Sequence, residues 1–546
     1  MTRTKSKYGL FTNKALFYLI VPIVIESALS MSMGFIDGIM VTHAASEAFL
    51  AVDPNAGDHF VTAITDVDQI SSLLIQLFAA FGVGGAVITS QHLGAGRTDD
   101  ANRSAKQLVV IMLLSALGIS ALCLGLNPYI ISLFFGNLDS HTHGYAVTYF
   151  YITACSFPFL AVFNSCAALL RAQRKSMNTM LSGIISFFLN IGFNALFIFA
   201  LKLGIAGVGL GTLLARVFPA CFTLFLMTRK TNVVRIRIFE KFRFDGGQLK
   251  KILKLGVPSG IENCFFQLGK ILVLVFIQAE IYNVFVGVNA DGTEIYTNFQ
   301  ASANSVAYNV NTISSMVGSG INTAVLTVIG QAVGAGDIGQ IKYYIKKMLL
   351  ISYVCNGVCV AATFGVAPFL LNSYNISEEA RAVAWNCLII CLSFQFFTYP
   401  LSFGMPAVLK ASSDVKYVMV VAVVSMVLMR VGLCYILTCD WAGARLGAIG
   451  LWIGMVSDWI VRSAFFGGRV LSGKWKKSAG LIMAPAGEGV CLQTCGEAAV
   501  ADGAEESGNI PLTAEYGAVS EDIAENAEEE TEQSEHTEGG NGGDVN

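Results

Sequence analysis

The sequence is poor in charge: only 13% of its 546 residues are Asp, Glu, Lys or Arg, whereas 54% are hydrophobic. Soluble globular domains carry about 25% charged residues, so this composition excludes a soluble enzyme. The chain also lacks a Gly-x-x-x-x-Gly-Lys-Ser/Thr phosphate loop, a zinc-binding spacing and a nucleophile elbow. We therefore expect neither enzymatic activity nor ATP-driven pumping, and no cofactor. These absences leave an integral membrane protein.

Cysteine gives little support for covalent or metal cross-links. Most of the 13 Cys residues lie in apolar segments, where Cys behaves as a small buried hydrophobe, so we expect no disulfide framework. Cys491 and Cys495 lack the second pair of ligands that a zinc site needs. A cleavable signal peptide is not expected either, because the first apolar run continues into a full membrane span.

Long apolar runs are what the sequence has in abundance. A helix of about 20 residues crosses a hydrocarbon core of about 30 Å, and twelve runs meet this length: 14–42, 69–93, 107–127, 145–170, 177–201, 206–228, 256–281, 301–331, 348–371, 383–409, 417–438 and 446–467. Lys and Arg concentrate in alternate connections, whereas the other connections, including the stretch 44–68, are rich in acids. The positive-inside rule therefore predicts that both termini are cytoplasmic.

The two halves of the chain are related by a repeat. Gly94-Ala95-Gly96 in the first half matches Gly334-Ala335-Gly336 in the second, and each triplet follows a Gln, at positions 91 and 331. Six spans in each half make the halves parallel, related by an axis along the membrane normal. We attribute these glycines to helix packing and to turns with positive φ, not to ligand binding.

Five regions follow from the spans, the repeat and the charge. The last region has 16 acidic and no basic residues, which is typical of disorder, although docking on the basic inner loops is an alternative. The regions are a cytoplasmic N-terminal tail (1–13), an N-lobe (14–228), a basic cytoplasmic linker (229–255), a C-lobe (256–477) and an acidic cytoplasmic tail (478–546).

Residues 14–477 resemble the multidrug and toxic compound extrusion (MATE) transporters. The resemblance depends on motifs in both halves: Pro22, Glu26, Met33 to Asp37, both Gly-Ala-Gly triplets, Arg171-Ala172, Asn190, Pro400, Lys410-Ala411, Arg430, Gly450 to Trp452, Asp458-Trp459 and Arg462. The segment 255–270 is most similar to the bacterial DinF-like branch. The resemblance implies an all-α fold of two pseudo-symmetric six-helix lobes around a cleft. It also implies alternating access, with export of organic cations, drugs or amphiphiles in exchange for H⁺ or Na⁺.

The same resemblance implies a coupling-ion site. Asp37 in the first span and Asn190 in the fifth match family positions, and Asn194 stands where several relatives have Asp. An acid inside the bilayer is costly and is a functional candidate by default, although a structural or helix-end role for Asp37 stays open. One acid with two amides carries a proton readily, which favours H⁺ slightly over Na⁺.

Five other polar residues are candidates for the walls of the transport cleft: Glu26, Glu262, Gln267, Lys270 and Arg430. Glu262 and Lys270 are eight residues apart, so we expect Lys270 to reach another helix. The alternative is that these residues only hold helices together. Asp458 and Arg462, at i and i+4, are expected to pair structurally. Arg216 has no evident partner in the sequence.

The preferred hypothesis is thus a secondary active exporter, a multi-pass monomer of the cell membrane that handles small molecules and no nucleic acid. Two alternatives remain. One is a flippase for a lipid-linked saccharide or lipid precursor, which would line its cleft with cations such as Lys270, Arg430 and Arg216. The other is a membrane sensor that does not transport.

Overall fold

The computed structural model describes most of the chain and consists of long helices. It describes residues 10–42, 44, 53, 56–136, 140–236, 244–277, 284–288, 294–374, 376–438 and 445–479. Within these residues, twelve helices are long and apolar enough to cross a membrane, as the sequence predicts. The regions 1–9 and 480–546, which hold most of both predicted tails, lie outside the described residues.

The first half contains six spans. They are α1 (Asn13–Thr42), α3 (Ala56–Gly94), α4 (Thr98–Gly125), α6 (Ser140–Ala172), α7 (Ser176–Ala195) continued by the π-helix η1 (Leu196–Ala200), and α8 (Ile205–Thr228). The short helix α5 (Asn127–Phe135) follows α4. The stretch 44–68 was expected to be an outer connection, but α3 begins at Ala56. Asp66 and Asp68 are therefore helical: α3 has additional turns with charged residues on the N-terminal side of its apolar run.

The second half repeats the arrangement. Its spans are α9 (Gly246–Ile277), α10 (Phe299–Gly334), α11 (Ile338–Ser373), α12 (Glu378–Tyr399) continued by η3 (Pro400–Gly404) and α13 (Met405–Ala411), α14 (Val415–Ser425) continued by η4 (Met426–Leu433) and α15 (Cys434–Thr438), and α16 (Gly447–Leu471). The short helix α17 (Trp475–Ala479) follows. The helix α9 begins at Gly246, within the range predicted as a linker, because Leu249, Ile252 and Leu255 continue its apolar pattern.

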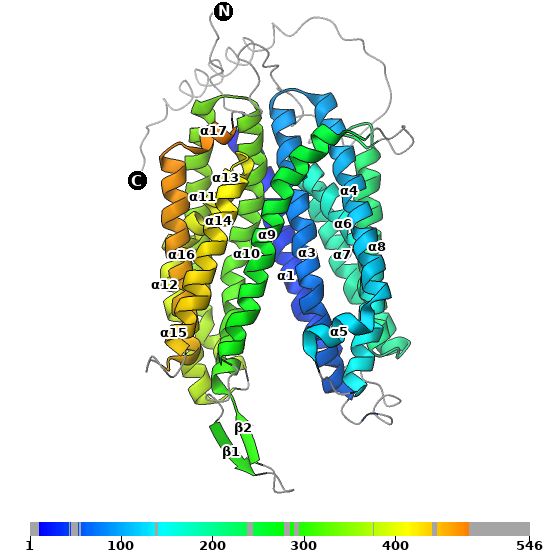
Figure 1. The fold of residues 1–546 in the computed structure, drawn as a ribbon, viewed down its shortest axis with the longest axis vertical. Coiled ribbons are helices and arrows are strands. Elements are labelled where there is room, and N and C mark those ends of the chain that lie inside the picture. Colours follow the sequence, from blue (N-terminus) through cyan, green and yellow to red (C-terminus); the bar gives the residue numbers. More distant parts are fainter. Residues whose placement is uncertain are drawn as a thin grey trace, which may run out of the picture. The chain divides into compact units, whose positions relative to one another are not determined.

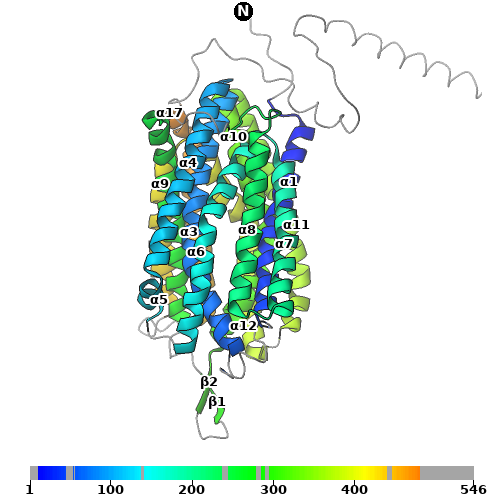
Figure 2. The same cartoon turned by 90° about the vertical axis from the view of Figure 1, so that its right-hand side faces the viewer.

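An antiparallel hairpin of β1 (Val284–Val288) and β2 (Glu294–Thr297) precedes α10 and was not expected from the sequence. Figures 1 and 2 show this hairpin at the opposite end of the helices from α17. We call the end that holds residues 94–96 and 334–336 the Gly-Ala-Gly end, and the other the hairpin end. At the Gly-Ala-Gly end, Gly96 and Gly336 have φ of 75° and 73°, so each closes its helix with the left-handed turn expected.

The first helix of each half packs into the core of the other half. Leu16 and Leu19 of α1 belong to a buried cluster with Val325 and Val328 of α10. In the same way, Ile252 and Leu255 of α9 belong to the buried cluster built mainly from the first half. The contacts of α3 with α9 and of α1 with α10 thus join the two lobes.

Glycine lets the lobes approach closely at the Gly-Ala-Gly end. A Cβ at Gly94 would lie 2.0 Å from the carbonyl oxygen of Gln331, and a Cβ at Gly334 would lie 2.0 Å from that of Gln91. Farther along the same interface, a Cβ at Gly84 would lie 2.9 Å from the backbone nitrogen of Gly256. The repeated triplets are therefore contact points between the lobes.

Candidate functional site

Asp37 of α1 and Asn194 of α7 meet inside the N-lobe. The side-chain amide of Asn194 donates a hydrogen bond of 2.8 Å to Asp37 Oδ1, and it lies 3.5 Å from Asn190 Oδ1. Asn190 and Asn194 are buried, with 1% and 0% of their surface exposed. The three residues proposed from sequence for ion coupling thus lie in one cluster, and their spacing along α7 puts both amides on one face.

A glycine on the neighbouring helix makes room for this cluster. A Cβ at Gly211 of α8 would lie 2.0 Å from Asn194 Oδ1, so any larger residue would displace the amide. Asn194 Oδ1 is buried and accepts no hydrogen bond among the described residues. The cluster therefore holds a carboxylate, which α1 supplies, and a free buried acceptor.

Asp68 and Arg216 belong to the same region and were not recognised from the sequence. The charge of Arg216 acts on both Asp37 and Asp68, and Arg216 Nη1 donates to Ser156 Oγ at 2.6 Å. Tyr149 donates to Asp68 Oδ1 at 3.4 Å. Asp68 had been assigned to an outer connection because the apolar run starts after it. The sequence signal for this region was Arg216, because this charged residue lies within a predicted span and has no evident partner in the sequence.

Glu26 and Glu262, by contrast, sit in ion pairs that the repeat relates. Glu26 Oε1 lies 2.9 Å from Arg171 Nη1, and Glu262 Oε2 lies 2.9 Å from Lys410 Nζ. Glu26 also accepts a hydrogen bond of 2.8 Å from Thr179. Matching pairs at matching positions indicate that both carboxylates fix helices of their own lobe.

Gln267 and Lys270 of α9 lie close to the first half of the chain. Gln267 Nε2 is 3.2 Å from Ser72 Oγ of α3, so this pair bridges the lobes. Lys270 Nζ donates to Tyr308 Oη of α10 at 3.1 Å, so it reaches another helix as expected. Arg430 is buried in η4, with its Cζ 4.8 Å from the centroid of the Phe266 ring. Asp458 and Arg462 pair at 3.8 Å, also as expected.

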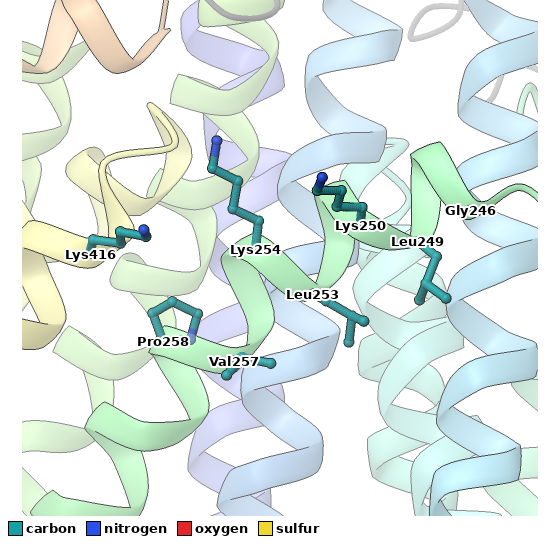
Figure 3. A pocket seen from close by; sticks show the side chains of 8 residues that line it. All are labelled: Gly246, Leu249, Lys250, Leu253, Lys254, Val257, Pro258 and Lys416. Atoms are coloured by element: carbon teal, nitrogen blue, oxygen red, sulfur yellow. The ribbon is translucent and has the colours of Figure 1, made fainter.

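A separate groove of about 490 Å³ lies along the first turns of α9 (Figure 3). Its lining combines Leu249, Leu253, Val257 and Pro258 with the amino groups of Lys250, Lys254 and Lys416. None of these residues contributes to the Asp37 cluster.

The comparisons with known proteins agree with this architecture. The MatE family model matches residues 22–196 and 298–436. The chain is 26% identical over 470 residues to the uncharacterized transporter YisQ of Bacillus subtilis, covering 84% of this chain and 94% of YisQ. It is 24% identical over 498 residues to the probable multidrug resistance protein NorM of Thermotoga maritima, covering 87% and 97%.

A solved structure described as the outward-facing conformation of a multidrug resistance MATE family transporter of the MOP superfamily has the same fold. It superposes with a TM-score of 0.72 at 20% identity, covering 85% of this chain and 96% of that one. The family model spans more than half of the sequence and both lobes. The chain is therefore a multi-pass membrane transporter that belongs to the MATE family.

Proposed function

We propose that this transporter exports organic cations, drugs or toxic amphiphiles in exchange for an inward-moving cation. The observation that carries the proposal is the contact of Asp37 with Asn194 beside Asn190. The similarity to a probable multidrug resistance protein supports this substrate class. The transporter would act as a monomer in the cell membrane, with its two lobes alternately opening to each side.

Asp37 has the chemistry of a coupling residue. A carboxylate inside a membrane protein gains or loses a proton as its surroundings become drier or wetter. An asparagine amide serves both states, because its NH₂ donates to the carboxylate and its oxygen accepts from the protonated acid. This amide favours H⁺ as the coupling ion, since a second carboxylate at position 194 would instead supply a charged Na⁺ ligand.

The distribution of charge supports an orientation. Arg97, Arg103 and Lys106 follow α3 at the Gly-Ala-Gly end, and Lys342, Lys346 and Lys347 follow α10 at the same end. The positive-inside rule makes this the cytoplasmic end, so both termini would be cytoplasmic. Since the described cross-lobe contacts concentrate there, we interpret this structure as closed to the cytoplasm.

Transport in proteoliposomes tests the proposal. A cationic dye should accumulate against its gradient when a pH gradient is imposed, and Asp37→Asn should abolish this accumulation. Asp66→Asn is the matched control, because Asp66 is a partly exposed acid of α3 and should leave dye transport within about twofold of wild type. Undiminished accumulation in Asp37→Asn would remove Asp37 from the mechanism.

A flippase for a lipid-linked saccharide or lipid precursor is the second candidate, because Lys270, Arg430 and Arg462 provide cations in the C-lobe. A fluorescent lipid pyrophosphate that crosses the proteoliposome bilayer faster than the dye would favour it. Failure of both substrates to move in preparations of folded protein would count against both candidates.

A further inference from the structure

Three cations of the C-lobe surround one aromatic ring. Lys270 Nζ, Arg430 Cζ and Arg462 Cζ lie 5.2, 4.8 and 5.6 Å from the centroid of Phe266. A cation within about 6 Å of a ring centroid is attracted to the ring face. A ring has only two faces, so Phe266 alone cannot stabilise all three positive charges.

The backbone brings these charges together from three helices. Lys270 and Phe266 lie on α9, Arg430 in η4 and Arg462 on α16. A Cβ at Gly269 would lie 2.2 Å from Met426 Sδ, so glycine at this position lets η4 approach α9. That approach allows Arg430 to reach Phe266.

One carboxylate offsets part of this charge. Asp458 is fully buried, lies 3.8 Å from Arg462 Nη1, and accepts a hydrogen bond of 2.6 Å from Ser425. Arg430 and Arg462 are only 5% and 3% exposed. Arg430 Nη1 and the Nε and Nη1 atoms of Arg462 nevertheless have no hydrogen-bond partner among the described residues. Buried guanidinium nitrogens that lack a hydrogen-bond acceptor are costly, so these nitrogens could donate to an anion.

Lys270 gives this cluster an exposed edge, next to a contact between the lobes. The Gln267–Ser72 contact lies farther from the Gly-Ala-Gly end than the cross-lobe contacts of Gly94 and Gly334. Lys270 follows Gln267 by three residues, about 4.5 Å farther from that end and on the same helix face. Lys270 is partly exposed, and its partner Tyr308 is 46% exposed.

On the facing helix, Asp68 precedes Ser72 by four residues and is solvent-accessible. It therefore lies about 6 Å beyond the same contact, on the N-lobe side. Just beyond the Gln267–Ser72 contact, α3 thus carries an acid, Asp68, and α9 carries Lys270, the partly exposed member of the cation cluster.

We propose that the cluster of Lys270, Arg430 and Arg462 is an anion subsite for substrates. It would take the carboxylate or phosphate group of an aromatic amphiphile, with the acid on Lys270 and Arg430 and the aromatic part against Phe266 and Tyr308. Guanidinium groups suit this role because they donate two parallel hydrogen bonds to such acids. The proposal rests on the proposed export function and narrows its amphiphile to one with an acidic group.

Binding of radiolabelled 2-naphthoate to the purified full-length transporter in a neutral detergent tests the subsite. Unlabelled naphthoate should compete, whereas 2-naphthamide, which has the same shape without the charge, should compete at least tenfold more weakly. A second arm places the protein in phosphatidylcholine nanodiscs with or without phosphatidic acid. Displacement of naphthoate by phosphatidic acid would identify a lipid headgroup as a source of the anion. If phosphatidic acid does not displace naphthoate, the anion is a soluble acid.

Lys270→Gln should weaken naphthoate binding at least tenfold. Arg430→Gln, provided that this variant folds, should also weaken naphthoate binding at least tenfold. Arg430→Lys should bind naphthoate more tightly than Arg430→Gln does. Lys416→Gln is the matched control, because Lys416 is a lysine of the same lobe that lines the separate groove (Figure 3). This variant should bind naphthoate as the wild-type protein does.

Equal binding by wild type and Lys270→Gln, or equal competition by the amide, would overturn the subsite. Export of the cationic dye is measured on the same preparations. Dye export without naphthoate binding would reject the anion subsite alone, whereas absent dye export with Asp37 intact would reject the proposed function.

Discussion

Gln91 and Gln331 occupy equivalent places in the two repeats, and each donates a hydrogen bond of 2.7 Å to a backbone carbonyl of the opposite lobe. Gln91 Nε2 reaches the carbonyl of Ala411, and Gln331 Nε2 reaches that of Ala172. The two acceptors are themselves repeat mates. Both glutamines are buried, so the Gly-Ala-Gly end is closed by a pair of symmetric, buried contacts.

Replacement of either glutamine should loosen this end of the protein. In Gln331→Leu, the buried carbonyl of Ala172 loses its donor, which costs about 1–3 kcal/mol. Hydrogen exchange measured by mass spectrometry should rise in peptides that cover residues 86–97 and 326–337. Asn102→Ala is the control, because Asn102 bonds to Thr98 and Arg235 away from the lobe interface, and should leave both peptides unchanged.

Glycine at position 94 should be essential for closing the lobes. In Gly94→Ala, the new Cβ would meet the carbonyl oxygen of Gln331 at 2.0 Å, so the lobes must separate locally. We expect at least a tenfold loss of transport at normal membrane abundance. Gly118→Ala is the matched control: its Cβ meets nothing within 4 Å, and alanine favours a helix over glycine by up to about 1 kcal/mol. Equal activity of the two variants would contradict the close contact.

The ion pair of Glu26 and Arg171 should contribute to stability. Their side chains are only 14% and 19% exposed, so the pair is partly buried, and removal of one partner costs up to the roughly 3–5 kcal/mol typical of a fully buried pair. Arg171→Met should therefore lower the midpoint of thermal unfolding in detergent, and Glu26→Gln combined with Arg171→Met should recover most of the loss. A double variant as unstable as the single one would show that the pair is not the cause.

Asn194 should set the choice of coupling ion. Asn194→Asp would place a second carboxylate beside Asp37, and two acids bind Na⁺ better than one acid with an amide. Dye export by this variant should become stimulated by a Na⁺ gradient, whereas wild-type export should respond to the pH gradient. A wild type that already requires Na⁺ and ignores pH would reverse this assignment.

Much of the architecture could be predicted from the sequence, because membrane spans need about 20 apolar residues and leave a strong pattern. The cluster of Asp37, Asn190 and Asn194 followed from resemblance to a family. Asp68 was not predicted to belong to this region. Hydropathy detects only the apolar run, whereas α3 begins before that run, at Ala56.

The partners of the other polar residues could not be predicted for a different reason. A helix face that contacts lipid and one that contacts protein are similarly apolar, so the pattern does not reveal which helices meet. The packing of α1 against the second half and of α9 against the first therefore came from the structure alone, as did the contact of Arg216 with Ser156.

The π-helical segments bear on how this chain should be aligned with its relatives. A π turn holds one residue more than an α turn, and η1 and η4 occupy the same span of the two repeats. In the α-helix on either side of a π turn, a shift of one residue corresponds to a rotation of about 100°. Asn194 just precedes η1, and Arg430 lies within η4. An alignment gap moved by a few positions here would therefore compare residues that face different sides of the helix.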